Sequence, residues 1–278
     1  MSRCTKEEAQ WRQARQELYT HLYESGKQGL NRDAVATTRK YFIPGPVFMP
    51  KPYEFEHEDD GVGLICAEIP REAALKCHAM GEELIALLPK RENDDAVGYV
   101  NELDLMHITL FHTSHPFDLA PHANTRREAD IEQLKQMLSG FSSFQVKPVR
   151  VLLASSGAVI LLFECLSDEP PAPGTQPSAT CVNANQEFSV DHMRRVAKET
   201  FEHVPKTAGT RTIVHSTLGR ILDPEVSEDA VKRVYEHCET LTKCLTEHPE
   251  PFRIRNVWYV EESHNYSPQG KKTVVTLQ

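Results

Sequence analysis

Four side chains in this sequence have the types and spacing that proton-transfer chemistry needs. His107 and Thr109 stand two residues apart in the apolar run MHITL, and His215 and Thr217 stand two residues apart in VHSTL. In an extended strand, residues two apart point to the same face, so each histidine shares a face with its threonine. A histidine, with an ordinary pKa of about 6.5, can give or take a proton near neutral pH. A threonine hydroxyl can donate a hydrogen bond to an anionic oxygen. These types predict general acid–base catalysis on an anionic group.

The two motifs belong to a longer internal repeat. His215 follows His107 by 108 residues, and F-x-I-x-x-V at 252–257 follows F-x-V-x-x-V at 144–149 by the same offset. A constant offset shared by several residue types indicates duplication of one structural unit. Two copies, rather than many, predict a two-lobed structure in which both histidine strands contribute to one site.

The elements around the motifs repeat in the same order. Apolar strands are predicted at 62–69, about 103–112, 144–153, 158–166, about 211–222, 252–260 and 273–277, and helical stripes are predicted after Pro70, around 131–138, from Met193 and after Ser227. This alternation predicts an α/β (α+β) fold with antiparallel or mixed sheets. The predicted domain spans 58–278, with copies at about 61–154 and 157–278.

Two segments fall outside the repeat. Residues 1–57 combine a stretch with Trp11, Leu18 and Leu22 at helical spacing with a Pro-rich stretch, and they predict a helical extension followed by a tether. We expect this helix to cover the core, with docking of a protein partner as the alternative. Residues 167–187 predict a Pro-rich insertion without regular structure.

Composition limits the function classes. Hydrophobic residues make up 40% of the chain, yet no stretch reaches the apolar length of a membrane span. The charged first residues lack the apolar core of a secretory signal, and the seven cysteines include no C-x-x-C pair. These features predict reduced thiols in the cytoplasm, with the nucleus as the other compartment. A net charge of −9 argues against a long nucleic-acid footprint, but allows a small anionic ligand or one RNA end.

The paired H-x-T-L motifs, the duplication and the closing F-x-I-x-x-V-x-x-V strand resemble the two-histidine (2H) phosphoesterase superfamily. That superfamily includes RNA 2′,3′-cyclic phosphodiesterases and 2′-5′ RNA ligase-like enzymes. The resemblance covers about residues 61–278. It implies a two-lobed pseudo-twofold fold, with antiparallel or mixed sheets around a central cleft that holds both motifs and with helices outside. The resemblance further implies phosphodiester chemistry without metal or organic cofactor. It also implies that His107 and His215 are catalytic and that Thr109 and Thr217 bind phosphate.

The residue types suit that reaction independently of the family. Opening a cyclic phosphodiester needs one base to take a proton from water and one acid to protonate the departing ribose oxygen. We therefore expect hydrolysis of an RNA 2′,3′-cyclic phosphate end or of a small cyclic nucleotide. A nucleotide-binding or scaffolding module without turnover is the alternative. The sequence leaves open which histidine is the base, which ribose oxygen leaves, and whether ligation occurs.

Other residues near the motifs are weaker candidates for substrate binding. Strand alternation places Phe111 on the face of its motif histidine and Arg211 on the face of the other, and Tyr259 lies on the closing strand. For both aromatic residues, packing in the core is the alternative. The same alternation places His112 and Arg220 on the opposite face, where an ion pair is expected for Arg220. No cysteine or carboxylate stands beside these histidines at a known ligand spacing, so no metal site is predicted.

Overall fold

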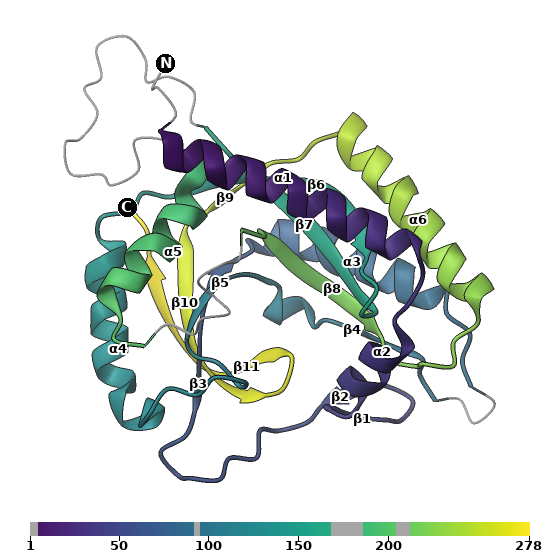
Figure 1. The fold of residues 1–278 in the computed structure, drawn as a ribbon, viewed down its shortest axis with the longest axis horizontal. Helices are drawn as coiled ribbons and strands as arrows, with labels where there is room; N and C mark the ends of the chain where they lie inside the picture. The colour runs from purple at the N-terminus through teal and green to yellow at the C-terminus, as the bar shows by residue number, and fades with distance from the viewer. Residues whose placement is uncertain (1–4, 92–94, 168–185, 204–211) are drawn as a thin grey trace.

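The computed structural model describes residues 5–91, 95–167, 186–203 and 212–278, which form two large antiparallel sheets, a short strand pair and surrounding helices (Figure 1). The helices are α1 (Lys6–Lys27), α2 (Arg32–Arg39), α3 (Arg71–Ala86), α4 (Ala123–Leu138), α5 (Ser189–Thr200) and α6 (Glu228–Glu247), with 3₁₀ turns η1 (Leu103–Leu105) and η2 (Gln186–Phe188). The strands are β1 (Phe42–Ile43), β2 (Met49–Pro50), β3 (Val62–Glu68), β4 (Gly98–Val100), β5 (His107–Ser114), β6 (Phe144–Leu153), β7 (Ala158–Leu166), β8 (His215–Ile221), β9 (Phe252–Ile254), β10 (Asn256–His264) and β11 (Ser267–Thr276). Apart from its two ends, the predicted Pro-rich insertion lies outside the described residues.

Each large sheet contains one histidine strand. The four-stranded sheet has the order β11-β10-β3-β5, and the five-stranded sheet has the order β4-β8-β7-β6-β9. Neighbouring strands pair antiparallel throughout both sheets. β5 begins at His107 and β8 begins at His215. The predicted fold class, α/β with antiparallel sheets and outer helices, is confirmed.

The sheets exchange strands between the two sequence copies. β10, from the second copy, pairs with β3, while β6, from the first copy, pairs with β7. The trios β10-β3-β5 and β6-β7-β8 are therefore equivalent, as a pseudo-twofold fold requires. The predicted copies at 61–154 and 157–278 do not correspond to separate lobes, because each leaves an open strand edge that the closing strand of the other copy covers.

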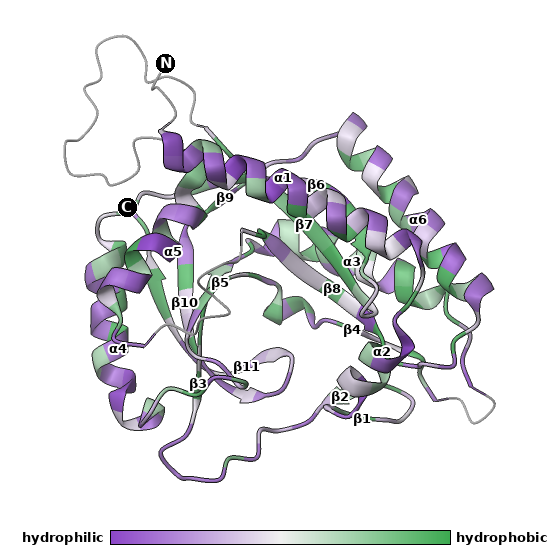
Figure 2. Ribbon diagram, in the orientation of Figure 1, coloured by the Kyte–Doolittle hydropathy of each residue, from purple (hydrophilic) through white to green (hydrophobic). Residues whose placement is uncertain are grey.

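Two helices cover the outer face of each large sheet, and α1 packs on part of the inner face of the five-stranded sheet, where Tyr19 and Leu22 contact the cluster around Ile160. α4 and α5 pack on the four-stranded sheet, and α3 and α6 pack on the five-stranded sheet (Figure 1). One apolar cluster runs beneath them and includes Phe111, Phe163 and Leu134. Figure 2 shows hydrophobic residues along the central strands and hydrophilic ones on the outer turns of the helices. Since successive side chains of a strand alternate, the face turned away from the helices can carry polar groups.

The N-terminal segment packs against the lobes. α1 begins with a capping box, in which the Thr5 hydroxyl accepts from the Glu8 N–H at 3.2 Å and the Glu8 carboxylate accepts from the Thr5 N–H at 2.7 Å. Farther along, β1 pairs with β2, and Phe42 and Phe48 are buried against Tyr99. The stretch predicted as a tether is therefore anchored. Prolines are compatible with this pairing, because each strand of an isolated pair has one edge without ladder hydrogen bonds, where the missing proline N–H is not needed.

Candidate active site between the two histidine strands

The two motifs meet in one pocket of about 330 Å³. Its walls come from β5, β8 and the β10–β11 hairpin, and the segment after β4 adds Asn101. The four predicted motif residues all line it: His107, Thr109, His215 and Thr217. The side chains that begin the two histidine strands, 108 residues apart in the chain, thus face the same volume.

A β-bulge interrupts each histidine strand just after its motif. In β5, Thr109 pairs with Cys66 and Phe111 with Ile65, so Leu110 is an extra residue. In β8, the register shifts in the same way between residues 217 and 219. A bulge places two residues opposite one and reverses the alternation of faces beyond it. Two residues predicted to face away, at positions 112 and 220, therefore line the pocket.

Each bulge leaves carbonyl groups that the ladder does not pair. Asn101 supports the bulge in β8, since its Nδ2 donates to the Thr217 carbonyl at 2.6 Å and its backbone N–H donates to the Leu218 carbonyl at 2.9 Å. Arg194 donates to the equivalent carbonyls of β5. Buried carbonyls need such partners, so these donors stabilise the geometry that turns the later side chains inward.

The bulges correct two predictions made from alternation. Phe111 is 1% exposed and packs in the core, with its ring 5.6 Å from that of Phe201, so it does not reach the pocket. Arg220, predicted behind its strand in an ion pair, lines the pocket, and among the described residues it has no ion pair. Its guanidinium lies 4.6 Å from the ring centroid of Tyr266.

The other two weaker candidates do not enter the pocket. Tyr259 is buried on the opposite face of β10, in a separate pocket that Arg127 and Glu261 also line. The alternative of packing in the core therefore describes it better. Arg211 lies outside the described residues, so its role stays a prediction.

Sequence reasoning missed His112 and Arg220, although one signal connected them. They are 108 residues apart, the offset that relates the two motifs, and each lies five residues beyond its motif histidine. His112 lies beside His115, with ring centroids 4.7 Å apart, and both line the pocket. Among the described residues, no three histidine, cysteine or carboxylate side chains gather as a metal site.

Arg220 is a half-buried cation that faces the pocket. Its Nε is buried and has no hydrogen-bond partner among the described groups. Burial lowers the pKa of its guanidinium, because removal from water disfavours the charged form. An arginine nevertheless remains protonated at neutral pH. The pocket therefore offers a desolvated positive charge, which favours an anionic ligand.

His107 is held in one tautomer. Its Nδ1 lies 2.8 Å from the Leu105 carbonyl, and a carbonyl can only accept, so Nδ1 carries the proton. Burial lowers the pKa of His107 to about 4, with a smaller effect in the same direction from the charge of Lys272. At neutral pH the ring is therefore uncharged, and Nε2 is free of a proton and able to accept one.

Glu262 lines the same pocket as an uncharged carboxyl group. Burial raises its pKa to about 8, partly opposed by the Tyr53 hydroxyl, which donates to Oε2 at 3.4 Å. Below that pH the group is mostly protonated. The pocket thus keeps its positive balance at neutral pH despite containing an acidic residue.

No protein-family model and no curated protein matches this chain. Among solved structures, a conserved protein of unknown function from Agrobacterium tumefaciens aligns with a TM-score of 0.47 and 13% identity, covering 78% of this chain and 85% of that one. LigT from E. coli in complex with 3′-AMP aligns with a TM-score of 0.37 and 13% identity, covering 79% and 96%. Usb1 from Kluyveromyces marxianus with uridine monophosphate aligns with a TM-score of 0.35 and 9% identity, covering 78% and 97%. The function proposed for this chain accordingly rests on its own residues.

Proposed function

We propose that this chain is a metal-independent phosphodiesterase that opens a cyclic phosphodiester by two-histidine general acid–base catalysis. The supporting observation is that two histidine–threonine pairs, from equivalent strands of two sheets, line one pocket that also contains a half-buried arginine. Two imidazoles can divide proton removal and proton delivery between them, and this division suits a displacement at phosphorus. The substrate class is an RNA 2′,3′-cyclic phosphate end or a small cyclic nucleotide.

The proposed reaction assigns a direction to the protons. His107, neutral at pH 7, takes a proton from water through Nε2, and the water oxygen attacks phosphorus. His215, in its protonated form, gives its proton to the ribose oxygen as the P–O bond to that oxygen breaks. Thr109 and Thr217 donate hydrogen bonds to the non-bridging oxygens, and Arg220 offsets their charge. The product is a nucleoside monophosphate, or an RNA end that carries a phosphomonoester, and solvent then returns the two histidines to their starting protonation states.

The size and charge of the protein agree with a small substrate. The pocket volume of about 330 Å³ lies in the range of small-molecule sites. A chain with a net charge of −9 would repel a long polyanion, whereas one phosphoryl group needs only the local positive charge. The proposed partner is therefore a mononucleotide-sized ligand or the 3′ end of an RNA.

The deciding assay measures, in excess EDTA, formation of adenosine monophosphate from 2′,3′-cyclic AMP and conversion of the cyclic phosphate end of a short RNA into a terminal phosphomonoester. We expect turnover that the chelator does not change, because the proposed acid and base are side chains. Abolition by EDTA with recovery on adding a divalent cation would contradict a metal-independent mechanism. Saturable binding of both compounds without turnover would instead indicate the non-catalytic binding module.

Glu262 predicts a change in substrate affinity at alkaline pH. Its pKa is raised to about 8, so the carboxyl group ionises as the pH rises through that value and places a negative charge in the pocket. We expect the KM for an anionic substrate to rise above about pH 8 in the wild type. Glu262→Gln removes the ionisation and should remove this rise.

The matched control for Glu262 is its neighbour. Glu261 pairs with Arg127 at 2.7 Å and does not line the histidine pocket. Glu261→Gln should keep the alkaline rise in KM. The assignment would be wrong if Glu262→Gln kept the wild-type dependence of KM on pH.

A further inference from the structure

α1 contacts elements of both lobes. Near its start, Arg12 forms a bidentate ion pair, at 2.8 Å for each contact, with Glu187 in η2, just before α5, which packs on the four-stranded sheet. Near its end, Tyr23 stacks on Tyr235 of α6, which packs on the five-stranded sheet, with ring centroids 6.4 Å apart. Figure 1 shows α1 running from α5 towards α6 across the top of the molecule.

The middle of α1 reaches the segment that leads into β8. Arg15 donates through Nε to the Thr212 carbonyl at 3.0 Å. One turn later, the Tyr19 hydroxyl accepts from the Val214 N–H at 3.1 Å. Both hydrogen bonds are made to backbone groups of residues that lie within three positions of His215 in the chain. The position of that histidine therefore depends on a helix outside the duplicated part of the chain.

Arg194 of α5 ties the same segment to the other histidine strand. Its Nε donates to the Leu110 carbonyl at 2.7 Å, and one Nη donates to the Thr109 carbonyl at 3.0 Å and to the Ile213 carbonyl at 2.9 Å. The first two carbonyls belong to the bulge of β5, and the third lies two residues before β8. A single planar guanidinium thus bonds to both motif segments. Its several N–H donors point in fixed directions in one plane, which suits it to bridge carbonyls of two chain segments.

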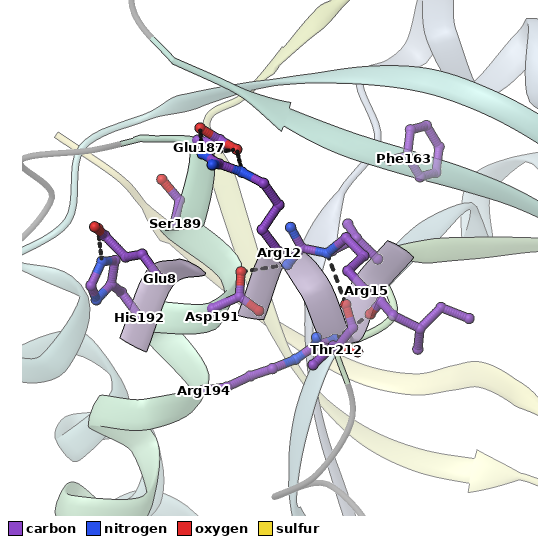
Figure 3. Close-up of polar contacts among 12 residues, drawn as sticks. Glu8, Arg12, Arg15, Phe163, Glu187, Ser189, Asp191, His192, Arg194 and Thr212 are labelled. Atoms are coloured by element: carbon purple, nitrogen blue, oxygen red, sulfur yellow. Dashed lines mark hydrogen bonds and ion pairs between the residues drawn. The ribbon is translucent and has the colours of Figure 1, made fainter. Parts of the chain in front are cut away.

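Asp191 pairs with Arg15, and Arg194 lies on the same helix, α5 (Figure 3). The Asp191 carboxylate and the Arg15 side chain are only 4% and 8% exposed. Burial lowers the pKa of Arg194, and the charge of Asp191 opposes this lowering in part. Removing Asp191 would therefore leave the buried Arg15 cation without its ion-pair partner.

We propose that the α1 clamp, formed by Arg15, Tyr19, Asp191 and Arg194, sets the relative position of the two pocket histidines. This inference rests on the proposed function. The histidines lie on different sheets, so their spacing depends on contacts between lobes, and a misplacement of about 1 Å in an active site can cost about 10²-fold in rate. The N-terminal helix is then a positioning element of the active site, rather than a docking site for a partner.

The test compares arginines on the same helix. Arg15→Met should lower kcat about tenfold or more while changing KM much less, because misplaced catalytic groups affect the chemical step more than binding. Arg12→Met is the matched control, since its ion pair with Glu187 joins side chains that are 44% and 32% exposed and touches neither motif strand. Exposed pairs contribute little, so this variant should keep the wild-type kcat. Tyr19→Phe, which removes one hydroxyl, should lower kcat in the same direction as Arg15→Met.

Folding and positioning are separated by working well below the Tm of every variant, with matching circular dichroism spectra required. A lower Tm with unchanged kcat in both Arg15→Met and Tyr19→Phe would overturn the clamp, as would an equal loss in Arg12→Met. If the wild type turned over no cyclic phosphodiester, the proposed function would fail. The clamp would then be tested by the ring ¹H–¹⁵N NMR spectra of His107 and His215, which report the surroundings of the two rings without any turnover. Arg15→Met should then shift the His215 ring signals and Arg12→Met should not. Unchanged signals in Arg15→Met would refute the clamp.

Discussion

Replacing either pocket histidine by alanine is expected to lower kcat for 2′,3′-cyclic AMP about 10²-fold or more, the usual cost of losing a general acid or base. His107→Ala removes the proposed base, and His215→Ala removes the proposed acid. Because the two act in one step, the double variant should lose little more than either single variant. Steady-state rates of product release measure all three.

A histidine outside the pocket controls for the loss of an imidazole. His237 of α6 lies 3.1 Å from Glu83 and does not line the pocket, so His237→Ala should retain the wild-type kcat. The pH profile adds a second check on the base. Since burial lowers the pKa of His107 to about 4, kcat/KM should fall only as the pH drops towards that value, rather than near 6.5. Wild-type turnover in His107→Ala or in His215→Ala would rule out the two-histidine mechanism.

Arg220→Met is expected to reduce kcat/KM about 10²-fold, comparable with the loss of a preorganised group that stabilises developing charge. The half-buried guanidinium lines the pocket and lies over the ring of Tyr266, so its charge acts on a bound phosphate at short range. Arg220→Lys keeps the charge but loses the planar fork, and it should recover only part of the rate. Initial rates at low substrate concentration measure the effect.

Arg39 provides the matched control. It too lies over an aromatic ring, 5.5 Å from the centroid of Phe48, and it does not line the histidine pocket. Arg39→Met should therefore leave kcat/KM unchanged even if it lowers stability. Equal values of kcat/KM for the wild type and Arg220→Met would show that the cation takes no part in phosphate binding.

Much of the architecture follows from local patterns. The strands around His107 and His215, and the helix capped by Ser227, arise from apolar periodicity and a capping side chain, which are properties of neighbouring residues. The duplication also follows from the sequence, because a repeated offset is visible without coordinates. These patterns were sufficient to predict α/β lobes and a site shared by the two motifs.

Which later side chains join that site depends on strand register. Alternation predicted that Phe111 would reach the site and that Arg220 would not, and the bulges reverse both. Register comes from pairing with distant strands, β3 for β5 and β7 for β8, so local periodicity does not contain it. The pairing of β10 with β3 and of β6 with β7 likewise depends on which distant strand edge each strand meets, and local periodicity does not contain that information.

The sequence by itself determined which residues have side chains suited to proton transfer and which of them share a strand face, because side-chain identity and a two-residue period are local. The tertiary structure decided that the two histidine strands face one pocket, that position 220 adds a cation, and that α1 reaches the segment before His215. Those features depend on contacts between residues about 100 or more positions apart. Such contacts form only when the lobes pack and buried polar groups must find partners.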